Sequence, residues 1–238
     1  MTDTSDLITG VLGTVQSILE HLGVVAFAIS GALVACRKRM DLVGVVVLGV
    51  IVAVGGGTIR DLVVQRTVFW VDDPTFLAMS ALAAICSVPA LSVASRQMRQ
   101  GYWLVQSFDA IGLALFVVTG TNIALESGAS AVAAAVIGIV SGMGGGVIRD
   151  VLANEVPQAL IGGRFYTTAA LVGSSVYIVL LEMNADAVVV LWIPILIVLA
   201  LRFVSLRYRI GVPTFGIDAG DDPSEPPQQS SDTASGHS

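Results

Sequence analysis

The sequence predicts an all-helical integral membrane protein, and three observations support this fold class. Of the 238 residues, 55% are hydrophobic and only 13% are charged, whereas soluble domains carry about 25% charged residues. Apolar stretches recur that reach the length a helix needs to cross a bilayer, about 20 residues. A glycine-rich motif occurs twice, as GGGTIRD at Gly55–Asp61 and as GGGVIRD at Gly144–Asp150. Because lipid offers no partner to unpaired backbone groups, the membrane spans must be helical.

Seven stretches are long enough to be transmembrane helices. Short turns rich in charged residues, Gly or Pro separate them, and the stretches 42–59 and 188–201 contain no charge at all. The predicted spans are 14–36, 42–64, 75–95, 103–125, 129–152, 165–183 and 187–206.

The predicted spans divide the chain into six segments. The tail is acidic and rich in Pro, Ser and Gln, so it is predicted to be disordered. The segments are an extracytoplasmic N-terminal segment (1–13), a first three-helix repeat (14–95), a cytoplasmic loop (96–102), a second, inverted three-helix repeat (103–184), a seventh transmembrane helix (185–206) and a cytoplasmic tail (207–238).

The basic residues of the loops predict the orientation in the membrane. Lys and Arg concentrate in alternate loops, as in the run Arg37–Arg39, while the opposite loops are mostly acidic, as at Asp72 and Asp73. Cytoplasmic loops carry the excess of Lys and Arg. We therefore expect a plasma-membrane protein with its N-terminus outside and its C-terminus in the cytoplasm.

The repeat extends well beyond the glycine motif. A shift of 89 residues places Gly23 on Gly112 and Phe27 on Phe116 without a gap. Each repeat holds three spans, an odd number, so the second copy enters the membrane from the other side. Inverted repeats of this kind are a recurring transporter design, with sites where broken helices meet near the midplane. The second and fifth helices are accordingly predicted to be broken at their GGG motifs.

The Arg–Asp pair that follows each GGG motif is the main candidate for function. Neighbouring residues on a helix point about 100° apart, so the internal two-fold predicts crosswise pairs, Arg60 with Asp150 and Asp61 with Arg149. Ionisable residues inside a membrane span usually mark a pathway. The alternative is that the charges lie at the membrane surface and that the glycines serve close helix packing.

Other polar residues in the spans join the candidate pore lining. Asp109 is an ionisable residue within the fourth span. Ser30 and Thr119 are repeat equivalents, for which small residues at a helix crossing are an equally good explanation. Glu20 and His21 are expected to face the outer headgroups. The pore-lining residues predicted from these patterns are Ser30, Gly55, Gly56, Gly57, Arg60, Asp61, Asp109, Thr119, Gly144, Gly145, Gly146, Arg149 and Asp150.

Several other classes of function find no support in the sequence. No Ser–His, Cys–His or paired-acid constellation recurs at a workable spacing, so an enzyme is not expected. The GGG motifs lack the Lys-Ser/Thr ending of a phosphate loop. We expect no cofactor, no structural metal and, without a basic patch, no nucleic-acid partner.

The motifs are similar to those of a known family. AFAISGALVACRKRMDLVG, AVGGGTIRDLVV and VFWVDDPTF in the first repeat, with FDAIGLALFVVTGTNIAL, GMGGGVIRDVLANEVP and RFYTTAALVGS in the second, resemble the bacterial glycine-transporter-domain family. Two copies of that domain make the prokaryotic relatives of trimeric intracellular cation (TRIC) channels. The resemblance covers roughly residues 15 to 206.

The resemblance implies seven helices, a homotrimer in the lipid bilayer and one pore inside each protomer. It also implies second and fifth helices kinked at the glycine motif, with polar residues that line a potassium-permeable path, and so adds Thr58 to the predicted pore-lining residues. Animal members carry a Lys-Glu-Val signature linked to inositol lipids, and this chain has Gly-Gly-Val-Ile-Arg there instead. We therefore expect a channel for small monovalent cations such as potassium or sodium, without inositol lipid dependence. The alternative is a secondary transporter of a small solute such as glycine.

Overall fold

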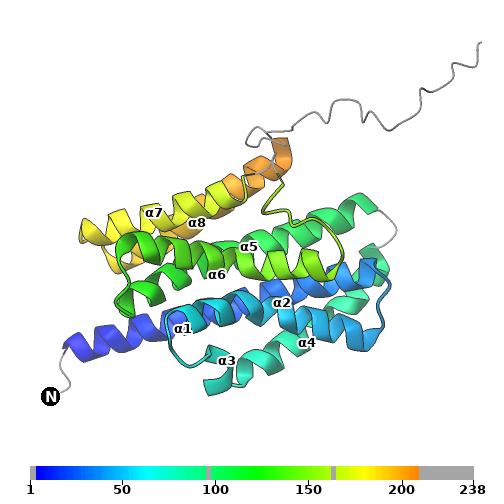
Figure 1. The fold of residues 1–238 in the computed structure, drawn as a ribbon, viewed down its shortest axis with the longest axis horizontal. Coiled ribbons are helices and arrows are strands. Elements are labelled where there is room, and N and C mark those ends of the chain that lie inside the picture. The colour runs from blue at the N-terminus through cyan, green and yellow to red at the C-terminus, as the bar shows by residue number, and fades with distance from the viewer. Residues whose placement is uncertain (1–3, 95–97, 162–164, 209–238) are drawn as a thin grey trace, which may run out of the picture.

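The structure is a computed structural model that describes residues 4–94, 98–161 and 165–208. The described residues form helices joined by short turns (Figure 1). In chain order the helices are α1 (Thr4–Arg37), α2 (Leu42–Val63), α3 (Phe69–Asp72), α4 (Thr75–Ala94), α5 (Met98–Glu126), α6 (Ala131–Leu152), α7 (Thr167–Glu182) and α8 (Ala187–Tyr208).

Each predicted span corresponds to a helix, in the predicted order. Over the described part of the chain, five helices are long and apolar enough to cross a membrane: α1 from Gly13, α2, α5 from Gly101, α6 and α8. The apolar parts of α4 (Thr75–Pro89) and α7 (Thr167–Glu182) are shorter. The structure also contains a single-turn helix, α3, that was not predicted from the sequence.

Three predicted boundaries fall differently in the structure, because α8 also continues to Tyr208, two residues into the predicted tail 207–238. Helix α1 already begins at Thr4, inside the predicted N-terminal segment 1–13, and α5 begins at Met98, inside the predicted loop 96–102. Most of the predicted tail, from residue 209 onward, lies outside the described residues.

Equivalent turns delimit the two glycine-bearing helices. The Asp41 side chain caps the start of α2 by accepting from the Gly44 amide at 2.7 Å. Ser130, 89 residues later, caps α6 by accepting from the Ala133 amide. Oxygen-bearing side chains at this position satisfy amides that a helix start leaves free. Each helix is followed by a residue in the left-handed region, Gln65 after α2 and Asn154 after α6, again 89 residues apart.

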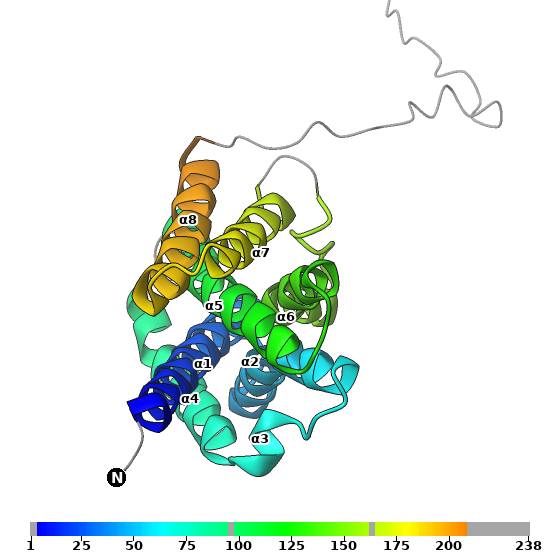
Figure 2. The ribbon, with the colours of Figure 1, turned by 90° about the vertical axis from the view of Figure 1, so that its left-hand side faces the viewer.

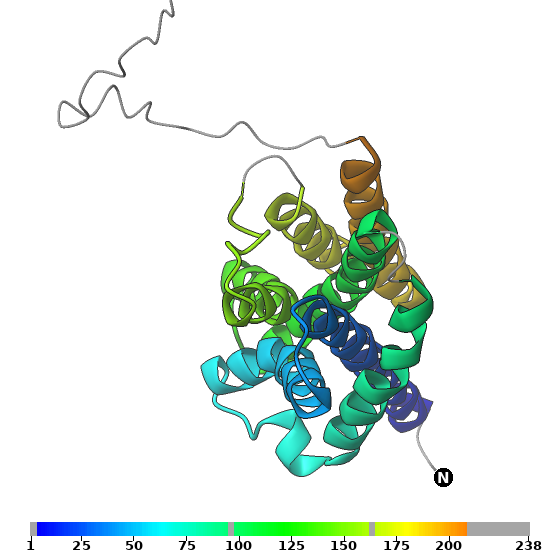
Figure 3. The same ribbon diagram turned by 90° about the vertical axis from the view of Figure 1, so that its right-hand side faces the viewer.

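The helices form one bundle in which the two repeats run in opposite directions. The chain direction shown by colour in Figure 1 is reversed between α1 and α5, and between α2 and α6. Seen end-on in Figures 2 and 3, α7 and α8 lie beside α5, and α3 and α4 lie on the opposite side, next to α1 and α2.

The contacts between α1 and α5 are reciprocal, as an internal two-fold requires. A Cβ atom placed at Gly23 would lie 2.7 Å from the Phe116 ring, and one placed at Gly112 would lie 2.7 Å from the Phe27 ring. The two phenylalanine rings themselves lie 5.6 Å apart between centroids. Each residue of one contact is 89 positions from its counterpart in the other. The two halves of the chain are therefore packed about a two-fold axis.

The prediction that the second and fifth helices are broken is wrong. Helix α2 is continuous through Gly55, Gly56 and Gly57, and α6 is continuous through Gly144–Gly146. The reason is the crossing of the two helices, where a Cβ atom at Gly145 would lie 2.6 Å from the Val52 carbonyl oxygen. At the equivalent place, a Cβ at Gly56 would overlap the Ser141 carbonyl. Glycine costs an exposed helix about 1 kcal/mol relative to alanine, but here it permits close backbone packing.

Candidate functional site

A first buried charge cluster lies where α1 and the end of α2 meet. It consists of Glu20, Arg60 and Asp61. Arg60 is completely buried; its Nη1 donates to Glu20 Oε1 at 2.6 Å and its Nε donates to Asp61 Oδ1 at 2.8 Å. The other oxygen of Asp61 accepts from the Phe69 amide at 2.9 Å. The cluster thus ties α1, α2 and the start of α3 together.

A second buried charge cluster lies where α5 and the end of α6 meet. It consists of Asp109, Arg149, Asp150 and Arg202. Arg149 donates to Asp109 at 2.8 Å and to Asp150 at 2.7 Å. Arg202, from α8, reaches the second oxygen of Asp109 at 3.3 Å. The other oxygen of Asp150, Oδ2, accepts from the Gln158 amide at 2.8 Å.

The two clusters are copies of one arrangement. In each, an arginine near the end of a glycine-bearing helix holds its neighbouring aspartate and a carboxylate from the helix that opens the repeat. In each, the aspartate also accepts from a backbone amide eight residues further on. The equivalent residues, all 89 positions apart, are Glu20 and Asp109, Arg60 and Arg149, Asp61 and Asp150, and Phe69 and Gln158.

The predicted crosswise pairs are wrong. Arg60 pairs with Asp61 rather than with Asp150, and Arg149 pairs with Asp150 rather than with Asp61. The Cβ atoms of neighbouring residues diverge, but an arginine side chain is long enough for its Nε to turn back to the adjacent carboxylate. The crossing between α2 and α6 is filled by glycine, so the charges stay within their own repeats.

Sequence reasoning missed two members of the clusters, Arg202 on α8 and Glu20 on α1, and only Glu20 could have been found from the repeat. Glu20 was expected to face the headgroups, but the residue is 8% exposed and its carboxylate holds a buried arginine. The repeat itself carried the signal, because Glu20 precedes Asp109 by the same 89 residues that relate the two GGG motifs.

The clusters differ in charge and in exposure. The first contains one cation and two carboxylates, and the Glu20 side chain is 11% exposed. Arg66, whose Nε lies 3.9 Å from Asp61, is itself largely exposed and adds little in such a position. The second contains two cations and two carboxylates, all at most 5% exposed. The first cluster is therefore the more acidic and the more accessible.

Of the repeat-equivalent residues Ser30 and Thr119, only Ser30 joins a charge cluster among the described contacts. Ser30 accepts from Arg149 Nη1 at 2.6 Å and donates to the Val105 carbonyl at 3.3 Å. Its equivalent, Thr119, donates to the Leu115 carbonyl in its own helix at 3.0 Å. Arg149 thereby links the second cluster to α1 of the first repeat.

The remaining predicted site residues pack around the clusters. A Cβ at Gly146 would lie 2.8 Å from Asp109 Oδ1, which the Tyr166 hydroxyl approaches to 3.1 Å. A Cβ at Gly57 would lie 2.5 Å from the Phe69 ring. Thr58 accepts from the Trp70 indole at 2.9 Å and so holds α3 against α2. Gly55 and Gly144 face Ile148 and Ile59 respectively, another reciprocal pair of contacts.

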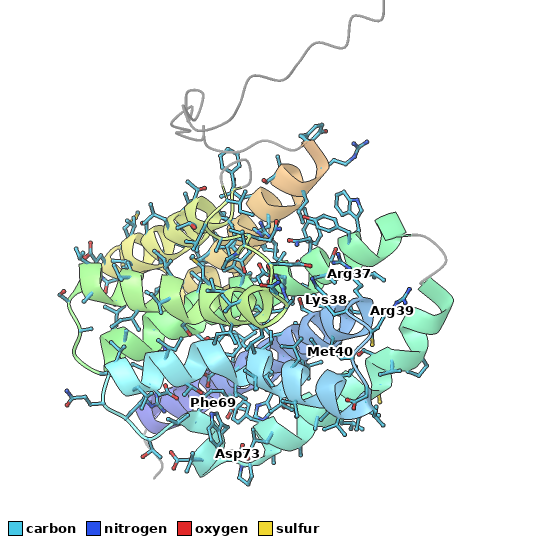
Figure 4. All side chains as sticks on the ribbon, turned by 45° about the vertical axis from the view of Figure 1, so that its right-hand side comes forward. Arg37, Lys38, Arg39, Met40, Phe69 and Asp73 are labelled. Atoms are coloured by element: carbon cyan, nitrogen blue, oxygen red, sulfur yellow. The ribbon has the colours of Figure 1, made fainter. Side chains whose placement is uncertain are left out.

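Next to Glu20 of the first cluster, His21 contacts the residues at the start of α4 and in the turn before it. His21 stacks on Phe76 with ring centroids 3.8 Å apart, and its Nε2 lies 3.1 Å from Thr75 Oγ1. The amide and hydroxyl of Thr75 donate to Asp73 and lower the pKa of that exposed carboxyl. Figure 4 places Phe69 and Asp73 at this end of the bundle, away from Arg37–Arg39. In the described ranges, no three His, Cys, Asp or Glu side chains gather as a metal site would require.

Comparisons with known proteins match the chain as two repeats. A family described as Glycine transporter matches residues 17–91 and again 106–182. The UPF0126 inner membrane protein YadS of Escherichia coli K12 is 38% identical over 209 residues, which cover 84% of this chain and 96% of YadS. A UPF0126 membrane protein of Deinococcus radiodurans is 40% identical over 203 residues, 82% of this chain and 89% of that protein.

Solved structures share the fold over almost their whole length. The TRIC trimeric intracellular cation channel orthologue from Rhodobacter sphaeroides matches with a TM-score of 0.76 and 37% identity, covering 82% of this chain and 98% of that one. A structure described as the basis for conductance through TRIC cation channels matches with a TM-score of 0.74 and 34% identity, covering 85% and 98%.

Proposed function

The chain belongs to the Glycine transporter domain family, with two copies of the domain in one polypeptide; on that basis we propose that it is a TRIC-type cation channel of the plasma membrane. Its solved relatives are named as TRIC cation channels, not enzymes, and match at 34–37% identity over more than four fifths of this chain. A relative from Escherichia coli is named an inner membrane protein. The permeant ion of the proposed channel is potassium or another small monovalent cation.

The observation that carries the proposal is the pair of buried charge clusters. In the span Gly13–Arg37 of α1, Glu20 lies about 7 Å along the axis from the centre, at 1.5 Å per residue. Asp109 lies at a similar distance from the centre of the span of α5, toward the other face. Carboxylates within membrane spans mark ion pathways. The Glu20 and Asp109 carboxylates lie on opposite sides of the midplane, so a cation crossing the membrane could bind to one and then to the other.

The proposed path follows α2 and α6 between the two clusters. Glu20 with Arg60 forms one end, and Asp109 with Arg149 and Ser30 forms the other. Because a Cβ at Gly56 or Gly145 would meet the backbone of the facing helix, these glycines act by setting the distance between α2 and α6. We keep the other predicted residues (Gly55, Gly57, Thr58, Asp61, Thr119, Gly144, Gly146 and Asp150) as the proposed surroundings of the path.

The proposed membrane arrangement has seven crossings, two inverted repeats and α8. Helices α4 and α7 occupy equivalent places in the two repeats, so both cross or neither does. The basic run Arg37–Arg39 marks the cytoplasmic side, and Asp72 and Asp73 mark the outer side. The N-terminus is then outside and the C-terminus inside.

The proposed assembly is a homotrimer with one path in each protomer. The relative from Rhodobacter sphaeroides is described as trimeric. Native mass spectrometry in mild detergent should show three protomers, and a clean monomer or dimer would count against the assembly.

Recording from purified protein in a planar bilayer tests the channel. Under a KCl gradient we expect discrete openings that favour cations over anions. A bilayer that stays silent with correctly assembled protein would contradict the proposal.

The two opposed repeats also favour a second candidate, a carrier for a small solute such as glycine. Radiolabelled uptake into liposomes separates the two. Saturable uptake with counterflow indicates a carrier, whereas uptake proportional to the gradient indicates a channel.

A further inference from the structure

Arg202 is a completely buried cation on the helix that lies outside the repeat. Its Nη2 donates to Gln106 at 3.0 Å and to Asp109 Oδ2 at 3.3 Å. Its guanidinium carbon lies 4.2 Å from the centroid of the Tyr166 ring, within the range of a cation–π interaction. Among the described residues the first cluster has no counterpart to Arg202, because none of the described helices of the first repeat is equivalent to α8.

The hydrogen bonding of Arg202 is incomplete. Its Nε and Nη1 atoms are buried and have no partner among the described residues. Buried polar groups are nearly always paired, and each exception calls for an explanation. An apolar side chain of similar volume often serves stability equally well at such a place. Packing alone therefore does not explain why position 202 is an arginine.

The position of Arg202 is explained by comparing the two carboxylates. Asp109 has both oxygens occupied, Oδ1 by Arg149 and Tyr166, and Oδ2 by Arg202. Glu20 has one oxygen on Arg60, and no second cation of the described chain lies within ion-pair distance of it. Carboxylate oxygens are ligands that hard cations prefer. Arg202 therefore covers Oδ2 of Asp109, whereas no cation of the described residues pairs with the second oxygen of Glu20.

We propose that Arg202 is a tethered cation that takes the place of a permeant ion beside Asp109, so that α8 controls passage at that end of the path. The inference rests on the proposed channel function. The contact of Arg202 with Asp109 is longer, at 3.3 Å, than that of Arg149, at 2.8 Å. Charge-assisted hydrogen bonds weaken with length, so the Arg202 contact is the one that yields. When Arg202 withdraws, Asp109 stays neutralised in part by Arg149 and offers one oxygen to the ion.

Single-channel recording in KCl tests whether Arg202 acts as a gate, that is, whether it controls passage beside Asp109. The recordings compare R202Q with wild type and with R202K. The matched control is R207Q, which removes an exposed arginine from the last turn of α8. We expect R202Q to raise the ratio of open to closed time about tenfold, the size expected from losing one charge-assisted hydrogen bond. R202Q should also shift the reversal potential toward that of potassium, because a carboxylate loses its cation. R202K, which keeps the charge, and R207Q should stay close to wild type.

The outcomes separate this inference from the function on which it rests. A wild-type protein that conducts, with R202Q unchanged in open time and reversal potential, overturns the gate and leaves the channel intact. A silent wild-type protein overturns both. If R202Q fails to assemble, R202M removes the charge at similar volume. The ratio of open to closed time and the reversal potential of R202M then test the gate. A loss of current in an assembled R202M trimer also counts against the gate.

Discussion

Glu20 and Asp109 occupy the same place in the two repeats, and each accepts a hydrogen bond from the buried arginine of its own repeat, at 2.6 and 2.8 Å. Each half of the molecule thus has its own charge cluster. The two-fold axis between the halves is lined by glycine and by reciprocal aromatic contacts. The two charge clusters lie at different depths in the membrane, and the uncharged contacts between the halves hold the repeats together.

Replacing Arg60 by alanine should strand two buried carboxylates, Glu20 and Asp61. Removing one partner of a buried pair costs about 3–5 kcal/mol, so R60A should unfold or lose its assembly at a lower temperature. Glu20→Ala in the same chain should recover part of that loss, which thermal unfolding in detergent measures. As a control, a second double-mutant cycle combines R60A with D150A. These two residues belong to different clusters, so the losses of stability in the single variants should add in the double variant. Strong coupling between R60A and D150A would mean that Arg60 pairs with Asp150 after all.

Gly56→Ala should destabilise the crossing of α2 and α6. The added Cβ would overlap the Ser141 carbonyl, and overpacking a tight contact costs about 1–3 kcal/mol. Gly13→Ala is the control, since a Cβ at Gly13 meets nothing within 4 Å. That change should be neutral or slightly stabilising, because alanine is the better helix former. Equal tolerance of both substitutions would mean that α2 and α6 do not pack this closely.

Gly146→Ala should displace the Tyr166 hydroxyl from Asp109. The new Cβ would lie 2.5 Å from that hydroxyl oxygen, so the variant should melt at a lower temperature. Tyr166→Phe removes the clashing oxygen and should restore part of the stability of G146A. The same tyrosine change should not rescue Gly57→Ala, whose Cβ meets Phe69 instead. Rescue of both glycine variants, or of neither, would contradict this geometry.

Cysteine labelling tests the orientation. In a background without the native Cys36 and Cys86, a cysteine replacing the exposed Asp72 should react with an impermeant thiol reagent in intact cells. A cysteine placed after Pro213 should react only once the membrane is opened. The opposite pattern would reverse the topology inferred from the loop charges.

The sequence was sufficient for the order of the helices and for the repeat. Hydrophobic length located the spans, and a constant shift of 89 residues related Arg60 to Arg149 and Asp61 to Asp150. The same shift would have related Glu20 to Asp109, but the position of Glu20 near the start of a span suggested a headgroup contact. In the structure α1 continues back to Thr4, which places Glu20 well inside the helix.

Two features depended on tertiary contacts that no local pattern contains. Three glycines in succession predict a helix break from intrinsic propensity, yet the approach of Gly56 to the Ser141 backbone keeps α2 helical. Arg202 lies outside the repeat, so no equivalent residue pointed to it. Its proposed role depends on the packing of α8 beside α5, which brings it to Asp109.

The central claim is that the two charge clusters lie on one cation path, and the reversal potential of wild type and E20Q under the same KCl gradient tests it most directly. Glutamine keeps the size of Glu20 and removes its charge at the more acidic cluster. We predict that wild type reverses between zero and the potassium equilibrium potential and that E20Q shifts toward zero, with less current. An E20Q protein that assembles and reverses where wild type does would contradict the claim, since the carboxylate would then lie off the path.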